Sequence, residues 1–490
     1  MGPMAEVRFT LNGAPHVATD VDPNTTVLEH LRIAGLTGTK EGCAEGECGA
    51  CAVALVAKAP DGSTRYEAVN ACLLLLAAVD GREMISVEGV ARGDELHPCQ
   101  TEMARAGGSQ CGYCTPGFVV SLFAEYYRAK DGVLDPECIA GNLCRCTGYR
   151  PIREAAERLA TIRIKEIATR VPDAHRARLD APSPPMGAVS IASEPNGAPS
   201  RRFVRPTSLI EACRIRASEP QLTLISGGTD LVVEINQRHK RFPGLLSLEA
   251  VPELRAWDDG ATHLTIGAGV PLAEVEERLH HDARLPMLGE LLPLFSSRLI
   301  RTRATFGGNL GTASPIGDGP PALLGLGAEL VLLSAVGDAV QRRVVSLDTF
   351  FLDYRKTALA PNELIAEVRI PKPFPTTQRF YKVSKRKMDD ISTVAAGFAM
   401  DRDATGVITM LRLAFGGVAA TPKRALAAEK VLVGKALTPE LVARARAEAL
   451  RELNPIDDHR GSARYRRAMI DRLVQRFFDE LDAQPAATHP

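Results

Sequence analysis

The first residues of the chain alternate between apolar and polar side chains. The alternation runs over residues 7–21 and surrounds Asn12-Gly13, a pair typical of β-hairpin turns. Residues 27–33 then have the spacing of a short helix. This pattern predicts a small β-rich domain with one helix, which we place at residues 1–92.

Helical spacing dominates the next stretch of the chain. Apolar residues recur three and four positions apart in 118–126 and again in 152–167, so residues 93–170 are expected to form a helical domain. Prolines and a scarcity of large apolar residues follow, a composition typical of a linker. We assign residues 171–200 to this linker.

The second half of the chain mixes strand-like and helical segments. Apolar β-like runs at 222–226, 264–268 and 329–334 predict an α+β domain over residues 201–377. A C-terminal α/β domain is expected over residues 378–490, with strands at 379–383 and 408–415 and helices at 424–433, 439–451 and 464–481. A chain of 490 residues is long enough for about three or four domains of ordinary size.

Charge and hydropathy narrow the classes of partner. The 59 Lys and Arg residues balance the 59 Asp and Glu residues, so the chain has no basic excess for nucleic acid. The longest apolar run, 71–79, is far shorter than the roughly 20 residues that cross a membrane. Residues 1–10 lack the apolar segment of a signal peptide. We therefore expect a cytoplasmic protein that binds neither nucleic acid nor membrane.

Ten of the eleven cysteines fall within the first 150 residues, which favours metal or redox sites over disulfides in a reducing cytosol. The first group has the spacing of plant-type 2Fe-2S ferredoxins and comprises Cys43, Cys48, Cys51 and Cys72. Glycines in this loop allow sharp turns that bring backbone N–H groups close to sulfur. A structural zinc site, or simple burial of the thiols, would be the other interpretations.

A second group consists of two cysteine pairs, Cys111 with Cys114 and Cys144 with Cys146. Each pair precedes a predicted helix, whose N-terminal N–H groups favour the negative charge of a thiolate-bound cluster. Zinc is a stronger alternative here because C-x2-C is common, but a second cluster beside a first suits electron transfer. The remaining cysteines are expected to be buried or free thiols, and they are Cys99, Cys138 and Cys213.

Two glycine turns in the second half of the chain indicate a dinucleotide site. Residues 223–230 run from an apolar strand into Gly227-Gly228-Thr229, and residues 304–318 contain Gly307-Gly308-Asn309 with several hydroxyls. Such turns bring backbone N–H groups to a pyrophosphate. Gly-Gly turns are common, so the pair rather than either turn alone points to a flavin. A flavin suits a chain with two clusters because it exchanges two electrons with a hydride carrier and single electrons with iron-sulfur centres.

These motifs, in this order, resemble those of the molybdenum hydroxylases, and most closely those of the small subunits of bacterial xanthine dehydrogenases. The resemblance rests on residues 42–51, 110–117 and 141–149 and on both glycine turns, and it covers nearly the whole chain. It implies a multidomain α+β fold. The parts would be a β-grasp ferredoxin-like domain, a helical-bundle 2Fe-2S domain, an FAD-binding α+β domain of the vanillyl-alcohol-oxidase type, and a C-terminal α/β domain of the carbon monoxide dehydrogenase flavoprotein type.

The resemblance also implies the residues that bind each cofactor. The eight cysteines of the two groups would be the metal ligands. The FAD contacts would be Leu224, Ile225, Ser226, Gly227, Gly228, Thr229, Asp230, Leu231, Phe295, Thr305, Gly307, Gly308, Asn309, Asp318, Leu364 and Lys382. The flavin face where NAD reacts would be approached by Tyr354, Asp389 and Asp390. A packed aromatic residue and a solvated charge run are the ordinary interpretations of those last positions.

By the same resemblance, the molybdopterin that meets the substrate would belong to a separate large subunit, in a heterotetramer of two small and two large subunits. Gln110 would reach that molybdopterin, so the cluster at Cys111 would be the nearest to it. Electrons from hydroxylation of hypoxanthine or xanthine would pass to this cluster, then to the cluster at Cys43, to FAD and finally to NAD.

Two alternatives stay open. The same relay could serve a hydroxylase of another N-heterocycle or of an aldehyde, with oxygen or a quinone as acceptor, because the substrate pocket would lie on another chain. A zinc-stabilised assembly protein without redox chemistry is the alternative from a different class. The identity of the bound metal separates this last alternative from the others.

Overall fold

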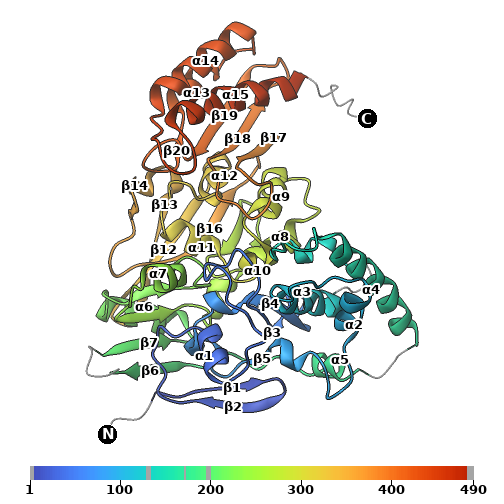
Figure 1. The fold of residues 1–490 in the computed structure, drawn as a ribbon. Helices are drawn as coiled ribbons and strands as arrows, with labels where there is room; N and C mark the ends of the chain where they lie inside the picture. The colour runs from blue at the N-terminus through green and yellow to red at the C-terminus, as the bar shows by residue number, and fades with distance from the viewer. Residues whose placement is uncertain (1–4, 129–133, 170–172, 195–199, 483–490) are drawn as a thin grey trace. The chain divides into compact units, whose positions relative to one another are not determined.

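The computed structural model describes residues 5–128, 134–169, 173–194 and 200–482 (Figure 1). The chain divides into two compact units, each assembled from segments that lie far apart in the sequence. The first comprises Met1–Ala212, Glu219–Pro252 and Ser297–Ala304, and the second comprises Cys213–Ser218, Glu253–Ser296 and Thr305–Pro490. Within the described ranges, none of the helices combines the length and apolarity needed to cross a lipid bilayer.

A five-stranded sheet begins the first unit. Its strands lie in the order β2-β1-β5-β3-β4 and are β1 (Val7–Leu11), β2 (Ala14–Ala18), β3 (Ala52–Lys58), β4 (Thr64–Asn70) and β5 (Glu83–Ile85). β1 and β2 form the hairpin that the alternation predicts, with Asn12 and Gly13 at positive φ. β1 also pairs in parallel with β5. The helix α1 (Val27–Ile33) follows, and the Thr26 side chain caps its N-terminus by accepting the N–H of Glu29.

One helix packs against the β3–β4 part of this sheet, and two more pack against that helix. α3 (Thr115–Arg128) contacts both strands, whereas α2 (Pro98–Arg105) and α4 (Arg150–Thr169) contact α3 and each other. Phe118 and Phe123 of α3 belong to the same buried cluster as Tyr66 of β4 and Ile152 of α4. The regions predicted as a ferredoxin-like domain and a helical domain therefore share one hydrophobic core.

The segment predicted as a linker contains ordered elements. α5 (Ala174–Leu179) begins after Asp173, whose carboxylate accepts from the N–H of His175 at 2.9 Å and from the Tyr127 hydroxyl at 2.6 Å. β6 (Val189–Ser193) pairs with β7 (Arg201–Arg205). A helix cap at one end and strand pairing at the other explain this order, which proline content alone does not reveal. Residues 170–172 and 195–199 lie outside the described residues.

A second sheet completes the first unit. It has the order β6-β7-β9-β8, and β7, β9 (Gly244–Ser247) and β8 (Thr223–Ile225) run parallel to one another. α6 (Leu209–Ser218) precedes β8, and α7 (Leu231–Arg238) follows it and contacts η1 (Ala71–Leu73). The side chain of Asn24 joins the two sheets, because its Nδ2 donates to Phe242 O at 3.1 Å and its Oδ1 accepts the N–H of Phe242 at 2.9 Å.

The second unit contains an antiparallel five-stranded sheet of order β10-β11-β16-β12-β13. The strands are β10 (Trp257–Asp259), β11 (His263–Gly267), β12 (Glu329–Val336), β13 (Ala339–Ser346) and β16 (Leu364–Pro371). The accompanying helices are α8 (Leu272–Leu279), α9 (Pro286–Leu291), α11 (Phe306–Gly311) and α12 (Gly319–Gly325), and a small hairpin is formed by β14 (Phe351–Asp353) and β15 (Lys356–Thr357). α10 (Arg298–Arg301) belongs to the first unit.

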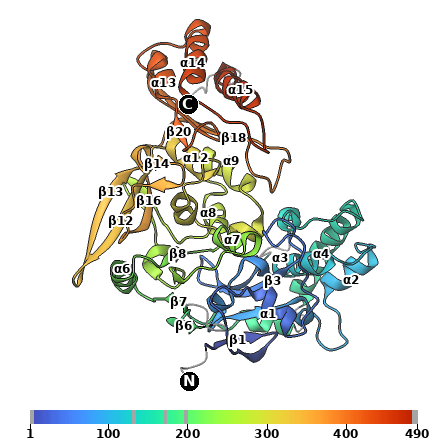
Figure 2. The same cartoon turned by 60° about the vertical axis from the view of Figure 1, so that its left-hand side comes forward.

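The C-terminal part of the second unit is a four-stranded sheet covered by helices. The strands β17 (Thr377–Val383), β18 (Val394–Arg402), β19 (Ile408–Gly416) and β20 (Lys423–Arg424) lie in sequence order. Figures 1 and 2 show α13 (Leu426–Leu432), α14 (Pro439–Glu452) and α15 (Ala463–Asp482) gathered beside it. Phe398 of β18 packs in one cluster with Phe477 of α15, whereas its neighbour Gly397 lies against the backbone of Pro321 in α12. Successive residues of β18 thus face opposite sides of the sheet, one toward α15 and the other toward α12.

Candidate functional site: two cysteine loops and two glycine turns

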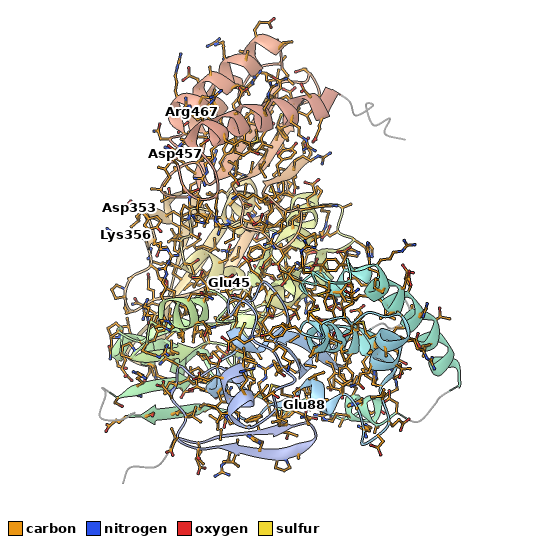
Figure 3. The ribbon with its side chains drawn as sticks, in the orientation of Figure 1. Glu45, Glu88, Asp353, Lys356, Asp457 and Arg467 are labelled. Carbon is orange, nitrogen blue, oxygen red and sulfur yellow. The ribbon has the colours of Figure 1, made fainter. Side chains whose placement is uncertain are left out.

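The first cysteine group lies in the loop between α1 and β3 and in η1. The side chains of Cys43 and Cys48 are hydrogen-bonded to each other, and so are those of Cys51 and Cys72. Backbone N–H groups of Glu45, labelled in Figure 3, and of Cys48 donate to Cys43 Sγ at 3.5 and 3.3 Å. The four thiols are therefore arranged two by two, as suits a cluster whose two irons each take two thiolates.

The conformation of this loop favours negative charge on the sulfur of Cys43. A hydrogen bond from the Cys48 thiol lowers the pKa of Cys43 to about 5, and backbone donors assist it while burial opposes it. Gly42 is needed for close approach, because a Cβ there would lie 2.7 Å from Cys48 Sγ. Gly46 turns the chain at φ +87°. These donors and this space fit an anionic 2Fe-2S cluster.

The second cysteine group pairs across the chain. Cys111 interacts with Cys146, and Cys114 interacts with Cys144. Cys114 directly precedes α3, and Cys146 lies four positions before the start of α4, so both predicted helices follow their cysteines. Thr147 contributes its N–H at 3.5 Å and its hydroxyl at 3.1 Å to Cys144 Sγ. The cross-pairing would again provide two thiols for each iron of the predicted cluster.

The two cysteine loops contact each other through their backbones. The N–H of Leu143 donates to Cys48 O at 3.0 Å, and Asn142 Nδ2 donates to Gly49 O at 3.0 Å. A Cβ on Gly49 would lie 2.3 Å from Gly141 O, and one on Gly117 would lie 2.1 Å from Gly49 O. Only glycine at these two positions allows the backbones to lie this close together. The ligand loops of both predicted clusters are thus neighbours.

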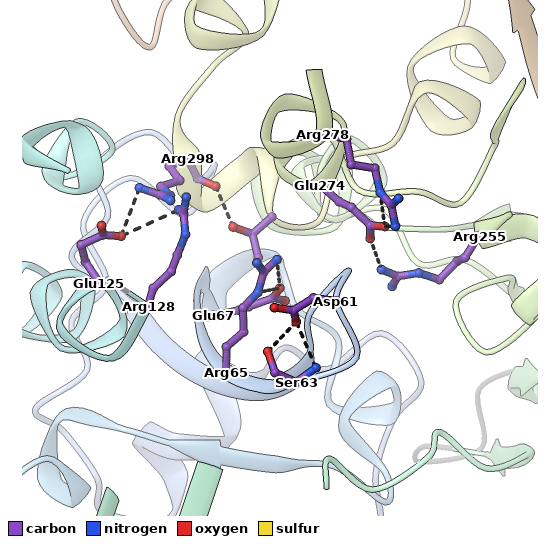
Figure 4. A network of polar contacts seen from close by, with 11 residues as sticks. Asp61, Ser63, Arg65, Glu67, Glu125, Arg128, Arg255, Glu274, Arg278 and Arg298 are labelled. Carbon is purple, nitrogen blue, oxygen red and sulfur yellow. Dashed lines mark hydrogen bonds and ion pairs between the residues drawn. The ribbon is translucent and has the colours of Figure 1, made fainter. Parts of the chain in front are cut away.

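A buried carboxylate anchors the helix that follows Cys114. Glu125 of α3 lies between Arg298, with Oε2 3.3 Å from its Nη1, and Arg128, at 3.8 Å (Figure 4). Its Oε1 accepts the N–H of Asp135 at 3.0 Å. Burial nevertheless raises the pKa of Glu125 to about 7, because it outweighs the charge of Arg128 and the hydrogen bond from the Asp135 backbone. Gln110, predicted to meet the molybdopterin, is exposed beside Cys111.

The first glycine turn joins β8 to α7. A Cβ on Gly227 would lie 1.8 Å from Arg303 O, and Gly228 has φ +77°. Arg303 Nε also donates to Gly227 O at 3.3 Å. The turn is therefore held against residues 303–304, which directly precede Thr305 in the chain. Its two glycines are structural requirements, and the backbone N–H groups of such a turn suit a pyrophosphate.

A buried ion-pair network supports this turn. Glu249 Oε1 lies 2.7 Å from Arg303 Nη1 and 3.9 Å from Arg82 Nη1. Burial alone would raise the pKa of Glu249, but Arg303 and Arg82 together lower it. Because Arg82 precedes β5 and Arg303 adjoins the turn, the network connects the ferredoxin-like part with the turn. None of these three residues was among the predicted site residues.

The second glycine turn begins α11. Thr305 caps the helix by accepting the N–H of Gly308 at 3.0 Å. The N–H of Gly307 donates to Ala268 O at 3.1 Å, and a Cβ on Gly307 would lie 2.6 Å from that oxygen. Asn309 Oδ1 is a buried atom without a hydrogen-bond partner in the described part of the chain. An unsatisfied acceptor beside a tight glycine turn fits a ligand that supplies a donor.

Two further predicted FAD contacts form a buried ion pair. Lys382 Nζ lies 2.8 Å from Asp318 Oδ2 and donates to Leu294 O at 2.7 Å. Asp318 Oδ1 accepts from the Ser392 hydroxyl. Leu364 is fully buried in β16, and Phe295 follows Leu294. Residues 224–231 belong to the first unit and the other predicted FAD contacts to the second, so their convergence on one FAD stays a prediction.

The residues predicted for the NAD side differ in their surroundings. Tyr354 is 58% exposed in the turn of the β14–β15 hairpin, flanked by Asp353 and Lys356 (Figure 3). Asp389 is buried and accepts from the Ser296 hydroxyl at 3.2 Å, whereas Asp390 accepts the N–H groups of its own loop. Tyr354 is thus available to a ligand, while the aspartates shape the loop that carries them.

Asn236 and Gln237 of α7 also touch the first cysteine loop, and sequence reasoning missed them. Asn236 donates to carbonyls that lie 192 and 164 positions earlier in the chain. Amides on a helix surface carry no motif, so only the folded structure brings them to the site.

Four family descriptions match the chain in succession. A 2Fe-2S iron-sulfur cluster binding domain matches residues 9–77, and a 2Fe-2S binding domain matches 86–157. An FAD binding domain in molybdopterin dehydrogenase matches 199–373, and a CO dehydrogenase flavoprotein C-terminal domain matches 379–481. These matches confirm the multidomain α+β fold class. Both cysteine groups lie within 2Fe-2S domains, so the zinc alternative has no support.

Curated relatives match over nearly the whole chain. A xanthine dehydrogenase of Emericella nidulans is 32% identical over 532 residues, covering 98% of this chain and 39% of the relative. A xanthine dehydrogenase of Drosophila subobscura is 33% identical over 519 residues, covering 95% of this chain and 38% of the relative. The chain therefore spans under half the length of these relatives.

Solved structures match just over half of the chain. A carbon monoxide dehydrogenase from Hydrogenophaga pseudoflava, which lacks the Mo-pyranopterin moiety of the molybdenum cofactor, has a TM-score of 0.53 and 31% identity over 56% of this chain and 95% of its own. A quinoline 2-oxidoreductase from Pseudomonas putida has a TM-score of 0.50 and 28% identity over 56% of this chain and 94% of its own. With its two 2Fe-2S domains and its FAD-binding domain, the chain belongs to the molybdenum hydroxylase family and forms an electron-transfer module of it.

Proposed function

We propose that the chain is the electron-transfer subunit of an NAD-dependent xanthine dehydrogenase. It takes electrons from hydroxylation of hypoxanthine or xanthine at a molybdopterin centre on a partner subunit. It passes them through two 2Fe-2S clusters and FAD to NAD, in a heterotetramer of two small and two large subunits. The similarity to xanthine dehydrogenases over 98% of the chain supports this assignment.

The contact between the two cysteine loops is the observation that supports the relay best. The 3.0 Å hydrogen bond from Leu143 N–H to Cys48 O joins a cluster ligand of one group to the neighbour of a ligand in the other. Two metal sites that served only to stabilise separate domains would have no need of this proximity. Electron transfer between two centres does need it.

The residues of the chain hold the carriers and set their surroundings. The cysteines of both groups supply thiolates, and backbone N–H groups stabilise negative charge on sulfur. We assign the two glycine turns to the pyrophosphate of FAD, which their backbone N–H groups would bind. When bound, FAD supplies the exchange between hydride transfer and single-electron transfer. We assign Tyr354, Asp389 and Asp390 to the NAD side and the exposed Gln110 to the side that meets the partner.

The first experiment is an anaerobic absorbance spectrum of the purified chain before and after addition of NADH. Rapid bleaching of both the flavin and the iron-sulfur bands is expected, because NADH should reduce the flavin and the flavin should reduce the clusters. A protein that carries flavin and clusters but is not bleached by NADH would contradict NAD as the acceptor. A protein without iron or flavin would contradict the relay itself.

A second candidate function has the same electron relay but a different substrate and a different electron acceptor. The quinoline 2-oxidoreductase with a TM-score of 0.50 motivates a substrate that is another N-heterocycle, with an acceptor other than NAD. The chain should be expressed with its molybdopterin partner and assayed with hypoxanthine, xanthine, quinoline and an aldehyde, each with NAD and with an artificial dye. Turnover of xanthine with NAD favours the first proposal, and turnover of quinoline with the dye alone favours the second.

A further inference from the structure

Two side-chain amides of α7 bind the backbone of the first cysteine loop. Asn236 Nδ2 donates to Ala44 O at 2.9 Å and to Cys72 O at 2.8 Å. Gln237 Nε2 donates to Cys43 O at 2.7 Å. Each acceptor belongs to a predicted cluster ligand or to its immediate neighbour. A single Asn side chain thus ties together the two halves of a ligand set that are distant in the sequence.

The same helix is attached to the first glycine turn. α7 begins at Leu231, directly after the turn, and the N–H of Val232 donates to Gly228 O at 2.9 Å. A Cβ on Gly228 would lie 3.5 Å from Leu73 O, so the turn also approaches the residue after Cys72. The turn, the helix and the ligand loop therefore form one connected layer within the first unit.

We propose that Asn236 and Gln237 are positioning residues that set the reduction potential of the first cluster and hold its ligand loop against the flavin side of the relay. This inference rests on the proposed function. Both amides donate to carbonyl oxygens of the ligand segments and not to sulfur, so their effect on the cluster is indirect. Each N–H offsets the partial negative charge of a carbonyl beside the ligands and holds the ligand backbone in place, which favours the more negative, reduced state of the cluster. Loss of these donors should therefore lower the potential.

The variants are chosen to remove donors while keeping side-chain size. Asn236→Leu removes one hydrogen bond to the loop and one to η1, and Gln237→Met removes one hydrogen bond to the loop from an exposed side chain. Asn24→Leu is the matched control. Asn24 also docks the second sheet on the first through two hydrogen bonds, but its partner is Phe242 and not the cysteine loop.

The measurement is an EPR-monitored redox titration of the full chain with its clusters and flavin. Asn236→Leu is expected to shift the reduction equilibrium of the first cluster about tenfold toward the oxidised state, which for one electron is about 59 mV. Gln237→Met should give a smaller shift of the same sign, and Asn24→Leu should give none. The potential of the second cluster serves as an internal reference in every sample.

The outcomes separate this inference from the proposed function. Suppose that the unmodified chain carries both clusters and is bleached by NADH. If the first cluster then has the same reduction potential in Gln237→Met and Asn236→Leu as in the unmodified chain, the inference is overturned and the relay stands. An equal shift in Asn24→Leu would also overturn it, because general loosening of the docking would then be the cause. If the unmodified chain binds no clusters, both conclusions fail. Should Asn236→Leu not fold, Gln237→Met alone decides.

Discussion

The two cysteine groups are built alike but enclosed differently. Cys51 and Cys72 of the first group are each 2% exposed, and amides of α7 bind their loop. In the second group Cys111 and Cys146 are exposed. The difference teaches that the first group is the more enclosed within this chain, whereas two predicted ligands of the second group face solvent. Exposed ligands leave room for the partner subunit that we propose.

The largest effect should come from removing a ligand from one group at a time. Cys43→Ser should destroy the first cluster, so that NADH still bleaches the flavin while the second cluster stays oxidised. Loss of a residue that hydrogen-bonds to a metal ligand typically lowers metal affinity or activity about 10- to 100-fold. Loss of a ligand itself should therefore slow reduction of the second cluster by more than about 100-fold. Stopped-flow absorbance with freeze-quench EPR measures this.

Cys146→Ser is the matched variant in the open group. It should remove the second cluster and leave NADH reduction of the first cluster at its normal rate. If Cys43→Ser still allowed rapid NADH reduction of the second cluster, the order of carriers would be wrong.

The contact between the loops should be the next most sensitive feature. Gly49→Ala would place a Cβ 2.3 Å from Gly141 O at a φ of +63°, so both a clash and backbone strain oppose it. We expect it to lower the free energy of unfolding by about 2 to 4 kcal/mol. Gly148→Ala is the control, because Gly148 has φ +65° with nothing within 4 Å of a Cβ. It should cost only about 1 to 2 kcal/mol, from strain alone.

Urea unfolding of both variants, followed by circular dichroism and by the loss of cluster absorbance, measures these costs. Equal costs for the two variants would mean that the loops move apart easily. The backbone contact would then not be the tight one that the structure describes.

Two buried glutamates should change the free energy of unfolding with pH in opposite directions. Burial raises the pKa of Glu125, near the second group, from 4.5 to about 7, so the folded state keeps its proton to a higher pH than the unfolded state. Stability should therefore fall as pH rises from 4.5 to about 7, by up to about 3 kcal/mol. Glu249 has a lowered pKa because Arg303 and Arg82 outweigh burial. Its contribution is present at neutral pH and lost as pH falls below 4.5.

The check is urea unfolding at several pH values between about 3 and 8. Relative to the unmodified chain, Glu125→Gln should flatten the decline above pH 4.5, and Glu249→Gln should lower stability most at neutral pH. Parallel pH profiles for the unmodified chain and Glu125→Gln would show that the two arginines keep Glu125 ionised.

The sequence predicted these two sites unequally. Spacing predicts all eight cysteines as ligands, and helical periodicity gives the bounds of α1 and, to within one residue, those of α14. Neither spacing nor periodicity predicts the pairing of Cys111 with Cys146, because that pairing depends on how two loops meet in the folded chain. The order in the segment assigned to a linker was also missed, because Asp173 and Tyr127 lie 46 positions apart. Local patterns report elements, whereas long-range hydrogen bonds decide how a site is completed.

The smallest expected effect tests whether the second group is tuned independently. Thr147→Val removes the hydroxyl 3.1 Å from Cys144 Sγ and keeps the backbone N–H bond to the same sulfur. The reduction potential of the second cluster should fall by less than about 59 mV, which corresponds to a change of less than about tenfold in its reduction equilibrium. The effect is small because one of two donors to Cys144 Sγ remains. The first cluster should keep its potential, since none of its donors changes. An EPR redox titration in which both clusters shifted together would show that the two environments are one, and the contrast between an enclosed and an open site would then fail.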